Sequence, residues 1–167
     1  MGRERAESLN IRVDLAAQRL DLAAGARVIE SYRVSTSKHG AGEQRGSYRT
    51  PRGRHVIRAK IGAGAALGTV FRGRRPTGET YTEELARAQP NGDWILTRIL
   101  WLSGTEVGKN RLGDVDTMRR YVYIHGAPDD AQLGVPGSIG CIRMANRDIV
   151  ALFDRVPVGT VVNIVEG

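Results

Sequence analysis

Short segments of alternating apolar and polar residues dominate the first part of the chain. Residues 11–15 and 19–22 alternate in this way. After an interruption at residues 23–25, the chain is again extended over residues 27–34. Alternation of this kind is typical of strands with one buried face. The pattern therefore predicts a β-meander of three short strands, and the same alternation over residues 55–61 predicts a fourth.

Three further strands are predicted in the second half. Residues 94–102 are apolar on both faces, as expected of a central strand. Residues 121–125 are β-branched and aromatic and predict a buried strand that ends at His125. Residues 160–165 predict a final strand. Between the strands lie long segments rich in turn-forming residues, which predict loops: residues 35–53, 73–93 and 104–120.

One clear helix is predicted near the C-terminus, besides a short helical turn in the second loop. Asn146 is expected to cap this helix, and Pro157 and Gly159 to end it. The prediction is a mostly β domain over residues 10–167, with long loops and a C-terminal helix, preceded by an extension of residues 1–9. Apolar residues recur at helical spacing: Ile149, Leu152, Phe153 and Val156.

Composition limits the class of protein. A chain of 167 residues, 41% hydrophobic and 26% charged, is expected to be one globular domain. No apolar run approaches the roughly 20 residues of a membrane span, and residues 1–8 lead into no apolar segment of a secretory signal. One cysteine excludes an internal disulfide, and with three dispersed histidines no metal site and no cofactor are expected.

The net charge of +7 leaves two interpretations open. A polyanion-binding domain is one, since a basic surface attracts nucleic acid. However, the arginines are scattered, no nucleic-acid motif is present, and two Phe and two Trp offer little surface for stacking bases. Nucleic-acid binding is therefore not expected. A well-solvated arginine-rich surface, or ligands that carry carboxylates, account equally well for the charge.

The candidate chemistry lies in one segment. The single cysteine, Cys141, follows His125 by sixteen positions, and glycines flank both residues. A thiol needs a neighbouring base to become a strong nucleophile, and imidazole is the usual one. The amides of Gly140 and Cys141 are expected to hold the developing oxyanion. On spacing alone, an inert cysteine and a structural histidine remain the alternative, and a structural role is expected for His39 and His55.

The segment resembles a known family signature. His125-Gly126 followed by residues 138–144 (SIGCIRM) is similar to the H-G … S-H-G-C-I-R motif of the YkuD-type L,D-transpeptidases. Residues 34–36 (VST) and 50–53 (TPRG) resemble the V-S-T and T-P-x-G segments of the same family, and the likeness extends from Ile11 to the C-terminus. The resemblance implies a β-sandwich with the cysteine on a loop at one edge.

The resemblance also implies a reaction and the residues that perform it. The family's cysteine attacks the third residue of a murein stem peptide, D-alanine leaves, and a thioester remains. Cys141 matches the nucleophile and His125 the base, and Gly126 matches the position whose carbonyl orients the imidazole. Arg143 matches the signature arginine, which is expected to anchor the signature loop or a substrate carboxylate, and Ser138 matches the signature serine.

One signature position differs from the family pattern. Ile139 stands where the family commonly has histidine, two residues before Cys141. Isoleucine neither donates a hydrogen bond nor takes a proton, so we expect altered substrate or acceptor preference in an enzyme that remains active. Ile139 and Tyr123 are therefore counted with Arg143 and Ser138 among the expected substrate contacts.

The acceptor of the acyl group decides between two activities. Water makes an L,D-carboxypeptidase that trims tetrapeptide stems, and an amine makes an L,D-transpeptidase that forms 3-3 crosslinks. The expected partners are murein stem peptides or soluble muropeptides, and the protein is expected to be a monomer. Without an export signal, cytoplasmic trimming in murein recycling is favoured; crosslinking in the periplasm is the alternative if the chain is a trimmed piece. A third possibility is a module that binds stem peptides without turnover.

Overall fold

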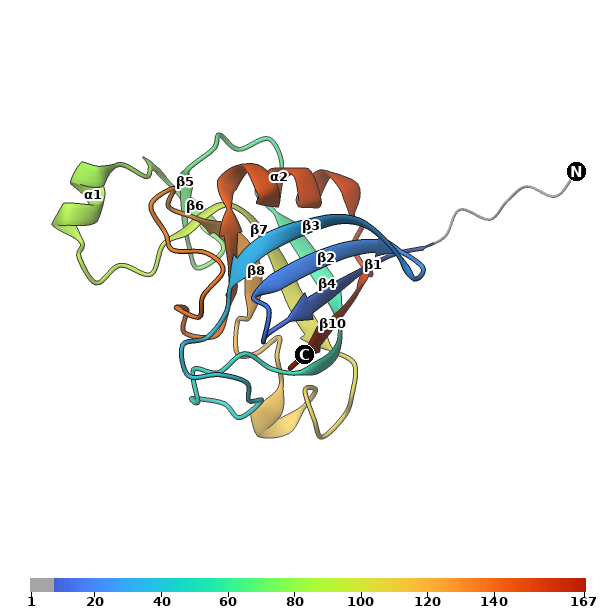
Figure 1. The fold of residues 1–167 in the computed structure, drawn as a ribbon. Coiled ribbons are helices and arrows are strands. Elements are labelled where there is room, and N and C mark those ends of the chain that lie inside the picture. The colour runs from blue at the N-terminus through green and yellow to red at the C-terminus, as the bar shows by residue number, and fades with distance from the viewer. Residues whose placement is uncertain (1–7) are drawn as a thin grey trace, which may run out of the picture.

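Strands form most of the regular structure (Figure 1). The computed structural model describes residues 8–167, so most of the expected extension at residues 1–9 lies outside the described residues. The strands are β1 (Leu9–Asp14), β2 (Arg19–Ala24), β3 (Arg27–Ser35), β4 (Gly53–Ile61), β5 (Thr69–Arg72), β6 (Arg75–Thr80), β7 (Ile95–Gly104), β8 (Tyr123–Ala127), β9 (Ile142–Ala145) and β10 (Val161–Val165). The helices are α1 (Glu83–Ala88), α2 (Asn146–Arg155) and a 3-10 turn, η1 (Gly113–Val115).

The strands form one sheet that closes on itself. Its order is β4-β10-β1-β2-β3-β9-β8-β7-β5-β6, and β4 also pairs with β7. The strands from β4 to β7 in that order therefore make a closed ring, which leaves them no unpaired edge. The β5–β6 hairpin lies outside the ring, where β5 pairs with β7. The predicted fold class, mostly β with a C-terminal helix, is confirmed. Because β4 pairs with both β10 and β7, it closes the predicted sandwich into one continuous sheet.

The main core fills the inside of the closed sheet. The alternating residues of β1 and β2 point into it, including Ile11, Val13, Leu20 and Leu22, all fully buried. Helix α2 contacts β7, β8 and β9, and Figure 1 shows it lying over the strands. Its apolar face joins the same core through the residues predicted from helical spacing: Ile149, Leu152, Phe153 and Val156.

Three strands lie where the sequence predicts no strand. β5 falls between the predicted fourth strand, at residues 55–61, and the predicted loop 73–93. β6 falls inside the predicted loop 73–93, and every one of its residues is exposed, so no alternation of polarity marks it. β9 has only four residues and follows Cys141 directly. Its position matters most, because it pairs in parallel with β8 and so joins the two halves of the signature.

The expected cap of α2 is wrong. Asn146 is the first residue of the helix, the cap position is Ala145, and no side chain caps the helix. The Asn146 amide instead accepts a hydrogen bond from the Thr97 hydroxyl on β7, at 2.5 Å. This contact ties the start of α2 to the strand beside β8. None of the helices within residues 8–167 is long and apolar enough to cross a membrane.

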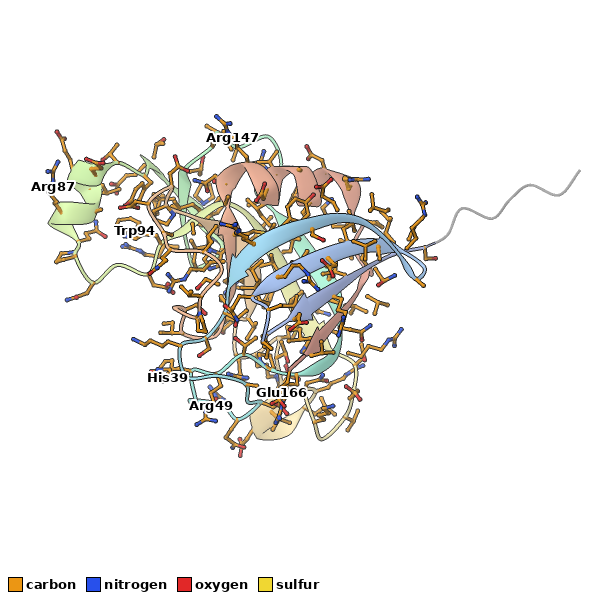
Figure 2. All side chains as sticks on the ribbon, in the orientation of Figure 1. His39, Arg49, Arg87, Trp94, Arg147 and Glu166 are labelled. Carbon is orange, nitrogen blue, oxygen red and sulfur yellow. The ribbon has the colours of Figure 1, made fainter. Side chains whose placement is uncertain are left out.

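The two remaining histidines differ in their surroundings. His55 is fully buried, and its Nδ1 lies 3.0 Å from the Gly53 carbonyl, which can only accept. Nδ1 therefore carries the proton, and Nε2 accepts from the Thr117 hydroxyl at 2.9 Å. His39 is exposed on the long loop before β4 (Figure 2).

Acid is expected to destabilise the protein in part through His55. Burial lowers the pKa of His55 to about 4 in the folded state, whereas the pKa of histidine in an unfolded chain is about 6.5. Between these values only the unfolded chain binds the proton, so the free energy of unfolding falls with falling pH by up to about 1.4 kcal/mol per pH unit. The stabilisation is complete above the unfolded pKa and is lost as the pH falls to the folded one.

Urea unfolding of His55→Gln at several pH values from neutral to mildly acid tests this expectation. The variant is expected to lose less stability with acid than the parent protein. His39→Gln is the matched control, because an exposed imidazole has no comparable burial, and it should keep the parent's dependence. A pH dependence in His55→Gln equal to that of the parent would contradict the assignment.

Candidate functional site

The parallel pairing of β8 and β9 brings the two halves of the signature together. Ile124 lies opposite Ile142 in the register, and both side chains are buried in the core. Because successive residues of a strand point to opposite faces, Tyr123 and His125 point away from this core. Cys141, just before β9, lies on the same outer face and packs beside Tyr123. The signature residues thus meet on one face of the sheet.

Cys141 is half-buried and held by two backbone groups. The Tyr123 amide donates to its Sγ at 3.3 Å, and the thiol points to the Tyr121 carbonyl at 3.5 Å. Burial raises the pKa of Cys141 to about 12, although the Tyr123 amide opposes this effect. A thiol with such a pKa is protonated at neutral pH. The sulfur is therefore a neutral thiol in this state.

His125 is buried with one nitrogen fixed and the other without a partner. Its Nδ1 lies 2.7 Å from the Gly126 carbonyl, so Nδ1 carries the proton and donates it. Its Nε2 has no hydrogen-bond partner among the described residues. Burial lowers the pKa of His125 in spite of the Gly126 contact, which raises it. The imidazole is thus neutral at neutral pH, and Nε2 offers a lone pair.

The thiol and the imidazole are not hydrogen-bonded to each other in this structure. Cys141 faces Tyr123 across the strands, and His125 is the next residue on that face. The two side chains therefore share one face of the sheet on neighbouring strands. Catalytic hydrogen bonds are often loose without substrate and tighten in the complex. The arrangement therefore suits a base that meets the thiol proton when substrate binds.

Gly126 is required for space as well as for its carbonyl. A Cβ atom there would lie 2.6 Å from the Leu96 carbonyl oxygen and would also meet the Asn146 amide. Its φ is not in the left-handed region. The backbone conformation alone would therefore accept a side chain, and it is the close approach of β7, which the sequence does not reveal, that excludes one.

Gly126→Ala is therefore expected to be severe. The methyl group must push β8 away from β7, which costs about 1–3 kcal/mol of stability and shifts the carbonyl that orients His125. Because the imidazole of His125 is then displaced, the rate of acylation by a carbapenem should fall, even in protein that is fully folded by circular dichroism. Normal acylation in a folded Gly126→Ala protein would show that β8 tolerates the shift.

The loop before β9 is braced by Ser138 and Arg143. Ser138 is buried, donates to the Cys141 carbonyl at 2.6 Å and accepts from the Gly140 amide at 3.2 Å. Arg143 donates to the Gly137 carbonyl at 2.8 Å. Gly140 has a φ of +129°, in the region that favours glycine. These contacts fix the turn that presents Cys141.

Those contacts change two expectations. The contacts of Ser138 and of one nitrogen of Arg143 lie within the loop, and neither residue lines the cleft, so this structure favours loop anchoring over substrate contact for both. The Gly140 amide, expected in the oxyanion site, is held by the Ser138 hydroxyl in this state. It must leave that hydroxyl before it can hold an oxyanion.

A cleft of about 620 Å³ opens in front of Cys141. Ile139 and Tyr123 line it as expected, and Ile139 is 43% exposed, so its apolar side chain shapes the wall. Tyr121, which lies just before β8, lines it too. No group of His, Cys, Asp or Glu side chains within residues 8–167 is arranged to hold a metal ion.

Arginines from separate segments gather around this cleft. Asp93 is the one carboxylate among the lining residues described. In the sequence these arginines look like scattered surface residues, and nothing in their spacing predicts that they meet. Four of them line the cleft: Arg45, Arg74, Arg119 and Arg120.

Arg120 holds the long loop before β4 against the site. Its guanidinium donates to the carbonyls of Gly42, Glu43 and Arg49, at 3.2, 3.1 and 2.6 Å. Figure 2 shows Arg49 on this loop, at the edge of the molecule opposite α2. Next to it, the Thr50 hydroxyl donates to the Gly140 carbonyl at 2.9 Å. The loop thus supports the turn that carries Cys141.

Comparisons with known proteins agree on one family. The family model described as the YkuD L,D-transpeptidase catalytic domain matches residues 9–164. A probable L,D-transpeptidase, ErfK/SrfK of Salmonella typhimurium, is 49% identical over 47 residues, which are 28% of this chain and 15% of that protein. The probable L,D-transpeptidase YbiS of Escherichia coli is 43% identical over 47 residues, with the same coverage.

Solved structures share the fold at low identity. An L,D-transpeptidase from Mycobacterium smegmatis has a TM-score of 0.56 at 17% identity, covering 96% of this chain and 59% of its own. L,D-transpeptidase 3 from Mycobacterium tuberculosis, in complex with a faropenem-derived adduct, has a TM-score of 0.56 at 14% identity, with 94% and 60% covered. The chain therefore spans about three fifths of these structures and a small part of the curated relatives.

Proposed function

Because the chain belongs to the family of YkuD L,D-transpeptidase catalytic domains, we propose that it is a cysteine acyl-transfer enzyme acting on murein stem tetrapeptides. In this proposal Cys141 is the nucleophile and His125 the general base. The bond that breaks joins the third residue of the stem to the terminal D-alanine. The acyl group then passes from the sulfur to water, which makes the activity that of an L,D-carboxypeptidase.

The observation that carries the proposal is the pair of neutral groups on one sheet face. Nδ1 of His125 is committed to the Gly126 carbonyl, while Nε2 is buried without a partner. A buried nitrogen without a partner is costly in a structural histidine. As a base it gains a partner at the moment the thiol releases its proton. A module that only binds peptides has no use for this arrangement.

The steps follow from these positions. As the sulfur of Cys141 bonds to the substrate carbonyl carbon, the thiol proton moves to Nε2 of His125. The imidazolium that forms keeps its Nδ1–H bond to the Gly126 carbonyl, the third-partner role of a catalytic triad. Collapse of the tetrahedral intermediate breaks the C–N bond, and Nε2 returns the proton to the leaving amine of D-alanine. A thioester remains on Cys141.

The second half of the reaction uses the same base. Nε2 takes a proton from water as the water oxygen attacks the thioester carbonyl. The C–S bond then breaks, and the sulfur regains the proton from Nε2, which releases the tripeptide stem. In both halves the amides of Gly140 and Cys141 are the proposed oxyanion donors, with Gly140 exchanging its Ser138 partner for the oxyanion.

The charge of the cleft supports water as acceptor. An amine acceptor approaches mostly as an ammonium ion, and four arginines against one carboxylate repel a cation. The same arginines attract stem peptides, which carry carboxylates. Formation of 3-3 crosslinks in the periplasm is the second candidate, and it is favoured by the relatives described as probable L,D-transpeptidases.

A single incubation separates the candidates. Purified protein is given disaccharide-tetrapeptide, and the products are read by mass spectrometry. We expect D-alanine and tripeptide in equal amounts and little crosslinked dimer. Dimer as the main product would replace the carboxypeptidase by the transpeptidase. Release of no D-alanine by a folded protein that still binds the peptide would identify a binding module instead.

A further inference from the structure

Arg74 reaches back over the cleft from the turn between β5 and β6. It has a φ of +63°, a left-handed conformation that a non-glycine residue rarely adopts. Its guanidinium carbon lies 4.8 Å from the centre of the Trp101 ring and 4.8 Å from that of Tyr121. Its Nη1 donates to the Tyr123 hydroxyl at 3.0 Å. Three aromatic residues of the site therefore orient one guanidinium.

The oriented guanidinium has donors to spare. A guanidinium carries several N–H donors around its edge, and rings that cover its faces leave this edge open. Only the Tyr123 contact uses one of them among the described residues. The ion pairs within residues 8–167 involve Arg19, Arg52 and Lys109, so none of them pairs a carboxylate with Arg74. Asp93, which shares the cleft, forms no ion pair there either.

Tyr123 connects this guanidinium to the sulfur. Its backbone amide donates to Sγ of Cys141 at 3.3 Å, and its hydroxyl accepts from Arg74 at 3.0 Å. The guanidinium is therefore one tyrosine side chain away from the atom that attacks. In a tetrapeptide the terminal carboxylate lies one residue beyond the scissile carbonyl, and Cα atoms of neighbouring residues are about 3.8 Å apart. Because Arg74 and Cys141 line the same cleft, a peptide bound over the sulfur has its terminal carboxylate in the space that Arg74 faces.

We propose that Arg74 is the specificity-determining residue that binds the C-terminal carboxylate of the leaving D-amino acid. This inference rests on the proposed function and names the group by which that site selects a free peptide end. The planar fork of arginine matches a carboxylate through two parallel hydrogen bonds, whereas an ammonium acts as a point charge. Stacking on Trp101 and Tyr121 holds the fork in place before substrate arrives.

The other arginines of the cleft are less suited to this role. The guanidinium of Arg120 already donates hydrogen bonds to three loop carbonyls. Arg45 and Arg119 are exposed, and neither stacks on an aromatic ring within residues 8–167. Arg45 lines the same cleft with the same charge. It is therefore a matched control for general electrostatic attraction.

Two substrates and three variants test the inference. The disaccharide-tetrapeptide is compared with the same compound whose terminal carboxylate is a carboxamide, and kcat/KM is measured for release of the last residue. A charged hydrogen bond is worth about 10–100-fold, so the parent should prefer the free acid by at least about tenfold. Arg74→Gln should lose that preference, Arg74→Lys should keep part of it, and Arg45→Gln should retain it.

The outcomes separate this inference from the proposed function. If Arg74→Gln lowers kcat/KM equally for both substrates, Arg74 only supports the hairpin, and the inference is wrong. If the preference persists in Arg74→Gln, another residue reads the carboxylate. Binding to Cys141→Ala, measured by calorimetry for both peptides, needs no turnover. A preference for the free acid that requires Arg74 in this assay would uphold the inference even if the enzyme proved inactive, and equal binding would overturn it.

Discussion

Cys141→Ala is expected to abolish acylation. The parent protein incubated with a carbapenem should gain the mass of one molecule per chain, because the strained carbonyl of the β-lactam accepts the sulfur. The variant should gain none, and its release of D-alanine should fall by at least about three decades, the scale seen when a nucleophile is removed. The effect is large because no other thiol is present in the chain.

Cys141→Ser provides the matched comparison. The hydroxyl has nearly the volume of the thiol, so packing against Tyr123 is preserved. Its proton is held far more tightly than that of a thiol, and we expect the same loss of acylation without a change in thermal stability. A carbapenem adduct in both variants would show that another side chain is the nucleophile. An adduct in the parent located elsewhere by peptide mapping would do the same.

The residues of the proposed reaction were predictable because the signature is local. His125-Gly126 and the run around Cys141 are recognisable as sequence. The predicted strand was expected to end at His125, but β8 continues to Ala127, and Cys141 directly precedes β9. Alternation also predicts the first three strands, since β1, β2 and β3 each bury one face in the core. Helical spacing predicts α2 for the same reason. In each case the spacing of the buried side chains predicts whether the segment is a strand or a helix.

Contacts between distant segments were not predictable in this way. Closure of the sheet depends on β4 pairing with both β10 and β7, and no residue of β4 encodes its partners. β6 is exposed throughout and carries no periodic signal. Arg74 becomes part of the site only because this hairpin turn meets Tyr121 and Trp101. Its unusual φ is the one local sign, and a sequence does not display it.

Burial shifts the pKa values of Cys141 and His125 in opposite directions, and this favours a neutral thiol beside a neutral imidazole. Burial raises the pKa of Cys141 to about 12 and lowers that of His125. A preformed thiolate–imidazolium pair requires the reverse order of the two pKa values. The thiol of Cys141 is therefore expected to keep its proton until the sulfur attacks a substrate carbonyl carbon. In the proposed reaction, general-base catalysis by His125 accounts for the reactivity of a thiol that is otherwise hard to ionise.

His125→Gln is expected to slow acylation by about two to four decades, the usual value of a positioned base. The glutamine amide can still donate to the Gly126 carbonyl, so the variant removes the base while it preserves one contact of the ring. Without a base only the thiolate reacts. Because the pKa of Cys141 is about 12, the residual rate should rise about tenfold per pH unit across the neutral and mildly alkaline range.

The parent protein should show a different dependence on pH. In the proposed reaction its base is the neutral imidazole, and burial lowers the pKa of His125, so the neutral form persists below pH 6.5. Stopped-flow measurement of carbapenem acylation should therefore give a rate that stays level through that pH and declines only in more acid solution. On the alkaline side the rate should not rise near the ordinary thiol pKa of about 8.5, since the thiol remains protonated there. A tenfold rise per pH unit in the parent, equal to that of His125→Gln, would mean that the thiolate reacts without the imidazole.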